Sequence, residues 1–294
     1  MKVLVIGATG FTGSSVVPLL LAQGARVRCM VRPTSNVGSL PLDSVDLFHG
    51  DLDNRESIDR AMRGTQTLAC LASLEWGHAA ALVSSAVAAG IRRAVFFSTT
   101  QIFTTLDRRV KAIRLAAEES IRSSGLRFTI LRPTMIYGGP RDRNMSRLIR
   151  FLERWPAIPV FGSGEYLQQP VYVEDVASAV RDCLATTATE DRAYNLAGAS
   201  KITYNQVIDT VCGLLRRKVR KIHLPAAPFI SLLSAVEAIF PFLPLKADQI
   251  RRLNEDKQFD FSDARRDFNY QPRSFEEGIR LELQAMGLAR AANL

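Results

Sequence analysis

The fold is decided by residues 3–13, VLVIGATGFTG, which join an apolar run to a turn with three glycines. A helical pattern follows from Ser14. In such a strand–turn–helix, Gly7 makes the tight turn, Gly10 lets the backbone approach a pyrophosphate, and Gly13 lets the helix pack closely on the strand. The helix N-terminus offers N–H groups and a positive dipole end to phosphates. The segment predicts a dinucleotide site; the alternative is a glycine turn that holds no ligand.

Outward from this turn, short β-branched runs alternate with longer stretches whose apolar residues recur at helical spacing. Such alternation predicts a parallel sheet with helices on both faces. We expect an α/β fold, a doubly wound Rossmann parallel sheet with a smaller C-terminal substrate lobe. The expected strands are 2–6, 26–31, 46–49, 67–71, 94–98 and 128–132, and the expected helices are 13–23, 54–62, 79–89 and 115–123.

Beyond Pro133 the alternation weakens and prolines become frequent, which indicates a change of domain. We expect an NAD(P)-binding Rossmann domain over residues 1–135 and a mainly substrate-binding lobe over residues 136–294. Ligands of open α/β sheets bind outside the carboxyl ends of the strands. A small-molecule substrate is therefore expected in the crevice between the two domains.

The composition is that of a folded chain with an excess of positive charge. Its 294 residues are 47% hydrophobic and carry a formal charge of +9, which favours anionic partners. The cysteines and histidines are scattered, so no metal site is expected, and a reducing cytoplasm fits them. The first strand begins without a signal segment, so we expect the mature chain to start as a folded domain. No nucleic-acid recognition module is present, and nucleic acid is not an expected partner.

The end of the second expected strand distinguishes NADP from NAD. An acidic residue there binds the ribose 2′-OH of NAD, whereas an arginine suits the 2′-phosphate of NADP. Residues 26–36 read RVRCMVRPTSN, without an acidic residue, and Arg32 lies just beyond the strand. We expect NADP(H) rather than NAD(H), with Arg32 contacting the phosphate. The alternative is an ordinary surface arginine.

Several motifs along nearly the whole chain form a family pattern. They are GATGFTG at 7–13, HGDLDN at 49–54, VFFSTTQIF at 95–103, AAEESIRSSGLRFTILRPTMIYGG at 116–139, QPVYVEDVASA at 169–179, AYNLAG at 193–198 and FSDARRDFNYQPRSFEEGI at 261–279. In these motifs the chain resembles the extended and atypical short-chain dehydrogenase/reductase superfamily, of the NAD(P)-dependent epimerase/dehydratase type.

The resemblance implies positions for the cofactor. Asp51 and Leu52 would lie near the adenine, Ala72 near the ribose and residues 134–136 near the nicotinamide, while residues 169–198 would return to the Rossmann sheet. Thr99 falls where such enzymes place a catalytic Ser or Thr; its hydroxyl either acts there or only caps the chain. The expected cofactor-binding residues are Gly7, Thr9, Gly10, Phe11, Thr12, Gly13, Arg32, Asp51, Leu52, Ala72, Thr134, Met135 and Ile136.

The chain departs from this family at the Tyr-xxx-Lys pair, in which lysine lowers the phenol pKa and tyrosine transfers a proton. Counted from Glu118, the tyrosine position holds Val110 and the lysine position holds Arg114. No tyrosine precedes Tyr137, so the pair is absent. Lys111 and Arg114 are three residues apart on an expected helix, so their side chains share one face. Two alternatives remain: both side chains contact the nicotinamide ribose or a substrate phosphate, or both belong to a solvated basic face. The candidate catalytic residues are Thr99, Lys111 and Arg114.

The second lobe has an apolar segment beside a basic run. Residues 225–245 read PAAPFISLLSAVEAIFPFLPL, and their prolines and Glu237 argue against a membrane span. The preceding run RRKVRK, residues 216–221, leaves two alternatives. The segment is either a helix packed on the lobe, or one lying on an anionic membrane in a peripheral contact through residues 216–245.

Two smaller features belong to the same lobe. Asp175 in QPVYVEDVASA either caps a helix starting at Val176, which we expect, or belongs to a site with its polar neighbours. Residues 244–257, PLKADQIRRLNEDK, are similar to the matching region of proteins related to the nine-type accessory subunit of mitochondrial complex I. Those proteins bind a nucleotide without an obvious reaction.

Two functions fit these features. The first is an NADP(H)-dependent oxidoreductase or epimerase that acts on a nucleotide sugar or another carbonyl or hydroxyl compound, with Thr99 orienting the oxygen. The second is a non-catalytic NADP(H)-binding protein that uses the cofactor as a structural or sensing ligand, on a membrane or within a complex. The glycine turn supports both, and Val110 favours the second. We lean to a cytoplasmic enzyme, because members of such superfamilies have replaced a proton donor while keeping hydride chemistry.

Overall fold

The chain forms two compact units, each assembled from segments that are distant in the sequence. The computed structural model describes residues 1–106, 108–239 and 246–288. The first unit combines Met1–Ile136, Val171–Ala197 and Asp260–Pro272. The second combines Tyr137–Pro170, Gly198–Phe259 and Arg273–Leu294.

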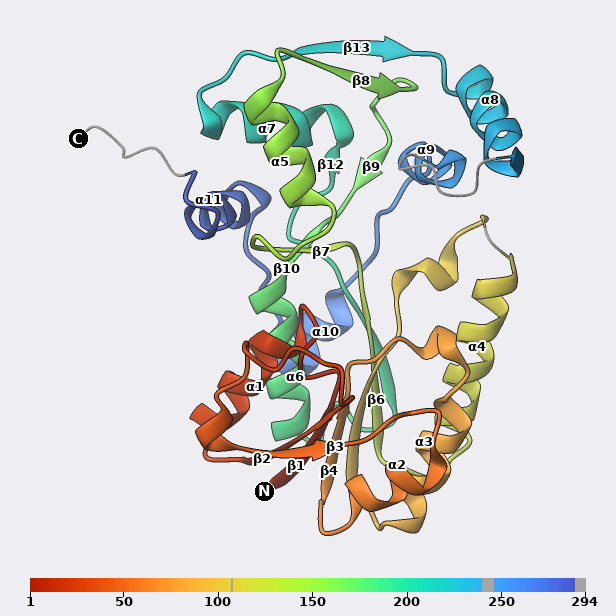
Figure 1. Cartoon of the computed structure of the whole chain (residues 1–294), viewed down its shortest axis with the longest axis vertical. Coiled ribbons are helices and arrows are strands. Elements are labelled where there is room, and N and C mark those ends of the chain that lie inside the picture. Colours follow the sequence, from red (N-terminus) through yellow and green to blue (C-terminus); the bar gives the residue numbers. More distant parts are fainter. Residues whose placement is uncertain (107, 240–245, 289–294) are drawn as a thin grey trace, which may run out of the picture. The chain divides into compact units, whose positions relative to one another are not determined.

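The first unit is built on a seven-stranded sheet in the order β11-β6-β5-β4-β1-β2-β3, and all neighbouring strands in it are parallel (Figure 1). The strand order reverses between β1 and β4, and such a reversal is where doubly wound sheets bind ligands. This topology confirms the predicted Rossmann fold. The strands are β1 (Lys2–Ile6), β2 (Arg26–Val31), β3 (Val45–His49), β4 (Thr67–Cys70), β5 (Arg93–Phe97), β6 (Phe128–Pro133) and β11 (Arg192–Leu196).

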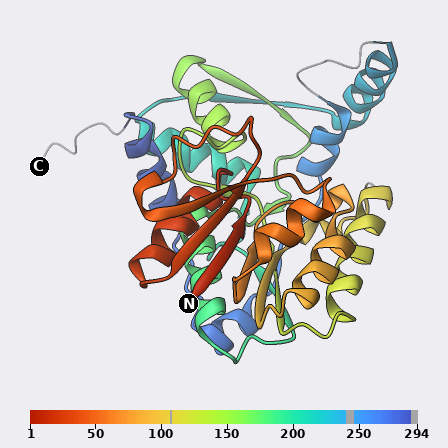
Figure 2. The same ribbon diagram turned by 60° about the horizontal axis from the view of Figure 1, so that its bottom comes forward.

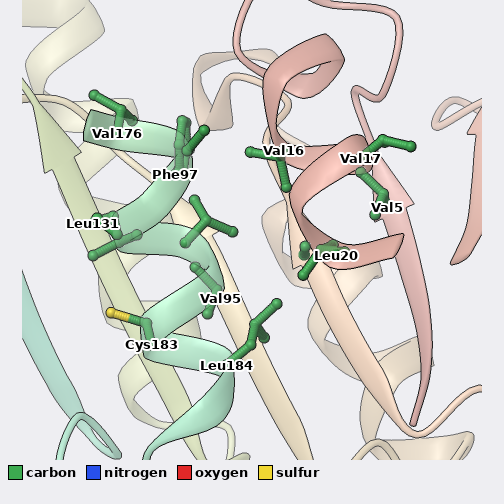
Figure 3. Close-up of a cluster of buried hydrophobic side chains, with 14 of the residues drawn as sticks. Val5, Val16, Val17, Leu20, Val95, Phe97, Leu131, Val176, Cys183 and Leu184 are labelled. Atoms are coloured by element: carbon green, nitrogen blue, oxygen red, sulfur yellow. The ribbon is translucent and has the colours of Figure 1, made fainter. Parts of the chain in front are cut away.

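Helices cover both faces of this sheet. On one face, α1 (Gly13–Ala22) packs against α6 (Val173–Ala185), and Val16 and Leu20 of α1 belong to the same buried cluster as Val95 and Leu131 of the strands (Figure 3). On the other face lie α2 (Arg55–Met62), α3 (Ala79–Ala88) and α4 (Arg108–Arg122), next to one another (Figure 2). Strands covered on both faces are apolar at successive positions, as the sequence of β1 is.

A buried arginine ties β5 to segments far along the chain. Arg93 is 8% exposed and donates hydrogen bonds to Thr129 Oγ1 at 2.5 Å, to Thr189 Oγ1 at 2.6 Å and to the carbonyl oxygen of Cys183 at 2.9 Å. Buried donors are costly when they lose their acceptors. One terminal nitrogen of the guanidinium, Nη2, therefore finds these acceptors only when β6 and residues 183–189 are both in place.

The second unit contains two small sheets. Strands β8 (Ala157–Phe161) and β13 (Arg220–Leu224) pair in parallel, and β9 (Leu167–Gln168) pairs antiparallel to β12 (Ile202–Thr203). In Figure 1, β8 and β13 run side by side above α5 and α7. The helices of this unit are α5 (Met145–Arg154), α7 (Tyr204–Leu215), α8 (Ala226–Ile239), α9 (Ala247–Leu253) and α11 (Phe275–Ala285).

Short elements complete the chain. They are η1 (Leu42–Ser44), η2 (Leu74–Trp76), η3 (Thr100–Phe103), β7 (Ile136–Tyr137), β10 (Val171–Tyr172) and α10 (Ser262–Phe268). Among the described helices, none has the length and apolar character needed to cross a membrane. Helix α8 covers much of the apolar segment 225–245, whose residues 240–245 lie outside the described residues.

Two predicted helix starts are wrong. Helix α4 begins at Arg108, not at Leu115, because Lys111 and Arg114 in its first turns are held by hydrogen bonds to residues outside the helix, which a periodicity cannot reveal. Helix α6 begins at Val173 with Tyr172 as its N-cap, so Asp175 lies in the first turn instead of capping the helix. A carboxylate there still interacts favourably with the helix dipole. The six predicted strands and the other three predicted helices agree with the observed bounds to within one residue.

Candidate functional site

The turn after β1 requires glycine at two positions. Gly7 has a φ of +86°, a left-handed conformation, and a Cβ there would lie 3.1 Å from the backbone nitrogen of Ala72. A Cβ on Gly13 would collide with the carbonyl oxygen of Gly7 and with the backbone of Ala8. At Gly10 a Cβ would meet only the Gly7 carbonyl oxygen within 4 Å. Gly10 therefore borders open space, as a backbone that receives a pyrophosphate must.

The N-terminus of α1 is free to receive an anion. Its N-cap, Thr12, makes no side-chain capping hydrogen bond, and its first turn contains no acidic residue. The N–H of Gly10 donates to the Gly7 carbonyl at 3.0 Å, whereas those of Phe11, Thr12 and Gly13 have no backbone acceptor in the part of the chain that the structure describes. Free N–H groups and the helix dipole together form a phosphate site. These residues fit a dinucleotide pyrophosphate.

Loops after three other strands of the sheet, β2, β3 and β4, carry further predicted cofactor residues. Arg32 follows β2, is exposed, and forms no ion pair with any described residue. Asp51 follows β3; its carboxylate accepts the N–H of Asp53 at 3.1 Å, and its own N–H donates to Ser57 Oγ at 3.2 Å. Ala72 follows β4 and lies beside Gly7. Since the carboxyl ends of parallel neighbours meet at one edge, these residues lie along the same edge of the sheet.

A cavity of 280 Å³ opens at this edge. Five of the predicted residues line it: Thr12, Thr99, Arg114, Thr134 and Ile136. The remaining lining residues are Leu71, Ser73, Leu74, Glu75, Phe97, Ser98 and Pro133. The ends of β4, β5 and β6 thus form a wall that continues from the glycine turn.

Arg114, one of the predicted catalytic residues, forms an ion pair. One of its terminal nitrogens lies 2.5 Å from Glu75 Oε2, and the other donates to Gln101 Oε1 at 2.7 Å. The two paired side chains are 12% and 32% exposed, which is more enclosed than an ordinary surface pair. This finding excludes a freely solvated basic face at Arg114. Its positive charge is matched by a carboxylate in the same cavity wall.

Lys111 has a different environment from Arg114. Its Nζ donates to the carbonyl oxygen of Thr104 at 3.2 Å, and it is not among the residues that line the cavity. The hydrogen bond holds the segment between η3 and α4. Lys111 and Arg114 therefore share a helix but not a partner.

Thr99 has an observed structural role. Its Oγ1 accepts the N–H of Gln101 at 3.3 Å, so Thr99 is the N-cap of η3. It also lines the cavity. The geometry is thus consistent with capping and leaves the hydroxyl at the edge where a substrate oxygen would lie.

Helix α4 is anchored to the sheet one turn beyond Arg114. Glu118 is 3% exposed, and its carboxylate accepts a hydrogen bond from Nε of Arg132 on β6 at 2.9 Å. It also pairs with an Nη of the same guanidinium. Burial would raise the pKa of Glu118, but the hydrogen bonds from Arg132 and Ser98 and the charges of Arg132 and Arg122 outweigh it and hold the pKa below its usual range. The carboxylate is therefore ionised and fixes the position of Arg114 through the helix.

Sequence reasoning missed Glu75 and Gln101. Glu75 lies in η2, the next element after β4, and Gln101 lies in η3, whose N-cap is Thr99. Glu75 belongs to none of the quoted motifs, whereas Gln101 lies inside the motif at 95–103, where the resemblance gives a role only to Thr99. Their positions after adjacent parallel strands were the available signal, because residues at that edge converge.

The parallel sheet, the glycine turn and the open helix N-terminus define a nucleotide-binding protein of the Rossmann class. Residues 7–187 match the model of the NAD(P)H-binding family. The chain belongs to that family.

Relatives and solved structures agree with this assignment. Photosystem II assembly factor Ycf39 of Trieres chinensis is 26% identical over 254 residues, 82% of this chain and 76% of that protein. NADH dehydrogenase (ubiquinone) 1 alpha subcomplex subunit 9 of Arabidopsis thaliana is 28% identical over 280 residues, 85% of this chain and 67% of that protein. The structure of UDP-glucose 4-epimerase from Thermotoga maritima with UDP-glucose superposes with a TM-score of 0.77 at 19% identity, covering 98% of this chain and 99% of the epimerase. The predicted resemblance to epimerase-type short-chain dehydrogenases/reductases, and to the nine-type complex I subunit, is confirmed.

Proposed function

We propose that the chain binds NADP(H) and uses it as a structural or sensing ligand, without tyrosine-dependent proton transfer. The Arg114–Glu75 pair is the observation that carries this proposal. A bound nicotinamide supplies or accepts hydride, and the usual partner reaction needs a phenol whose proton is made available by a lysine. Here valine and an arginine neutralised by glutamate occupy those positions.

Arginine does not replace the lysine–tyrosine pair. Its guanidinium stays protonated at all physiological pH values, so it cannot act as a general acid or base. With Glu75 and Gln101 holding it, the group orients the wall of the cavity instead of polarising a phenol. The names of the relatives point in the same direction, since one is an assembly factor and the other a subunit of a complex.

The exposed Arg32 supports NADP(H) over NAD(H). It follows β2 at the position where a 2′-phosphate is recognised, and its charge is not engaged by a carboxylate of the described residues. A free guanidinium can make a bidentate contact with phosphate.

A second candidate is an oxidoreductase or epimerase, and the cavity favours it. Its 280 Å³ are lined by the hydroxyl groups of Ser73 and Thr99 and by the carboxylate of Glu75. In this reaction Thr99 would orient a carbonyl or hydroxyl oxygen, and Glu75 or water would exchange the proton. The UDP-glucose bound by the structural relative makes nucleotide sugars the first substrates to test.

A binding titration followed by a turnover screen separates the two candidates. NADPH and NADH are titrated by fluorescence, and NADPH is expected to bind more tightly. Cofactor absorbance is then followed with nucleotide sugars, quinones and aldehydes, and no turnover is expected. Absence of NADPH binding would refute both candidates, whereas turnover would refute the first.

If turnover is observed, paired variants locate its proton donor. Glu75→Gln removes the carboxylate in the cavity wall, and Glu119→Gln makes the same change at an exposed position of α4. Loss of turnover in Glu75→Gln alone, with NADPH binding retained, would support the enzyme with Glu75 as its acid. Equal activity of both variants would exclude that role.

A further inference from the structure

One face of the small β8–β13 sheet in the second unit is largely apolar and partly exposed. Side chains alternate across a strand, and Lys221 and His223 of β13 point towards α7, where they bond to Asp209 at 2.7 Å and to Asn205 at 3.2 Å. The other face of β13 therefore carries Arg220, Ile222 and Leu224, and Ile222 is 45% exposed. The paired positions of β8 on this outer face are Ala157, Pro159 and Phe161.

Helix α8 extends this apolar face. The rings of Phe161 and Phe229 meet edge to face at a centroid distance of 5.2 Å, which joins the sheet to the helix. Two polar groups of α8 bond to α9: Glu237 accepts the N–H of Ala247 at 2.6 Å, and Ser234 accepts an N–H of Arg251 at 3.0 Å.

The opposite stripe of α8 faces solvent. Pro228, Leu232 and Ala235 recur at helical spacing and are exposed, Leu232 by 59%. No residue of α8 whose side chain the structure describes is buried. The helix thus packs on its neighbours with one side only and leaves an apolar side uncovered.

Unpaired cations border the apolar face. Arg216, Arg217, Lys218 and Arg220 are all exposed, and none of them forms an ion pair with a described residue. The last three also line a hollow of 530 Å³ at the end of α7, whose one acid, Asp209, is already paired with Lys221. Trp155, two residues before β8, is 51% exposed. Tryptophan and lysine or arginine are the residues that membrane interfaces favour.

We propose that the outer face of β8–β13 together with α8 is a docking surface for a bilayer that contains anionic lipids. Apolar side chains insert at the level of the headgroups while neighbouring cations bind lipid phosphates, which is the usual balance in peripheral attachment. The charge favours this occupant, because a protein partner would need a matching cluster of acids, whereas an anionic leaflet presents negative charge over any footprint. This surface shares no residue with the glycine turn or with the cavity at the sheet edge.

Vesicle sedimentation of the full-length protein tests the surface. Vesicles of phosphatidylcholine with phosphatidylglycerol are expected to bind the protein, vesicles of phosphatidylcholine alone to bind it weakly, and added salt to release it. The double variant Lys218→Gln/Arg220→Gln is expected to bind about 30-fold more weakly, from roughly fivefold per cation. The matched control is Arg60→Gln/Arg92→Gln, two exposed arginines of the first unit, and is expected to bind like the unchanged protein.

A second pair of variants tests the apolar contribution. Ile222→Gln/Leu232→Gln keeps the charge and is expected to weaken binding to anionic vesicles, because both side chains are largely exposed and the fold does not depend on them. Circular dichroism checks that each variant is folded. Equal binding by the Lys218→Gln/Arg220→Gln variant and its control would overturn the proposal. Absence of binding to anionic vesicles at low salt would also overturn it, and would leave a protein partner as the occupant.

Discussion

The glycine turn and the cavity wall belong to the same nucleotide edge but are constrained in different ways. At the turn, backbone atoms set the requirement, since a Cβ on Gly13 would collide with Gly7 and Ala8. At the wall, side chains determine the structure, and Arg114 pairs with Glu75. Backbone constraints permit almost no substitution, whereas a side-chain constraint is met by any group that finds a partner. A chain can therefore keep its cofactor site while its chemistry changes.

The largest effect is expected at the turn. Gly13→Ala should destabilise the protein by about 4 kcal/mol, because the clash involves backbone that cannot move aside. NADPH binding should be lost with it. Gly213→Ala is the control, since a Cβ at this glycine of α7 meets no atom within 4 Å and should stabilise the helix slightly. Thermal denaturation measures both, and a Gly13→Ala protein as stable as its control would show that the turn tolerates a side chain.

The second-largest loss of stability is expected at Glu118, which joins α4 to β6 through Arg132. Glu118→Gln should cost about 3 kcal/mol, because it leaves the buried side of Arg132 without its carboxylate. Glu119→Gln, exposed on the same helix, should change stability by less than about 0.5 kcal/mol. Chemical denaturation at neutral pH compares the two. A similar small effect for both variants would mean that α4 is held in place by apolar packing alone.

The same carboxylate predicts an acid dependence of stability. The pKa of Glu118 is lowered on folding, so its stabilising contribution is present above the ordinary glutamate pKa and is lost as the pH falls through the lowered value. Glu118→Gln should therefore lose less stability on acidification than the unchanged protein. Parallel acid-denaturation curves of the two proteins would contradict this assignment.

A smaller effect, on cofactor binding, is expected at Arg32, where the adenosine half of the cofactor would lie. Arg32→Ala should weaken NADPH binding about tenfold and leave NADH binding unchanged, because one charge-assisted contact to the 2′-phosphate is lost. Fluorescence titration with NADPH and with NADH gives the ratio of the two dissociation constants. Arg26→Ala, an exposed arginine at the start of β2, serves as control. An unchanged preference in Arg32→Ala would remove Arg32 from the phosphate site.

The smallest effect is expected at Thr99. Thr99→Val should cost about 1 kcal/mol, the usual value of a lost cap, and leave NADPH affinity unchanged. Thr99→Ser keeps the hydroxyl and should restore most of the stability. A large loss of NADPH affinity in Thr99→Val would instead give the hydroxyl a direct role in binding the cofactor.

The two sides of the comparison also differ in how far the sequence predicts them. The turn and the strands of the Rossmann sheet follow from local patterns, because glycine spacing and apolar runs act over a few residues. Glu75 and Arg114 are 39 residues apart, and no local rule pairs them. The start of α4 was missed for the same reason, since its first turns are held by partners such as Thr104 and Glu75.

Helix α8 shows a different limit of prediction from sequence. Its apolar composition predicts a helix but does not say which side is covered, because coverage depends on neighbours such as Phe161. The structure describes a helix that is packed on one side and exposed on the other. The two alternatives that the sequence left, packing on the lobe and contact with a membrane, therefore do not exclude each other.

The discontinuity of the first unit has a consequence for the order in which the protein matures on the ribosome. Arg93 needs acceptors at Cys183 and Thr189, and β11 joins the sheet only after residue 192 has been made. The segment Asp260–Pro272 completes the same unit still later. A nascent chain that already contains the glycine turn and strands β1 to β6 thus still lacks β11 and the segment Asp260–Pro272, so the first unit is complete only when synthesis is nearly finished.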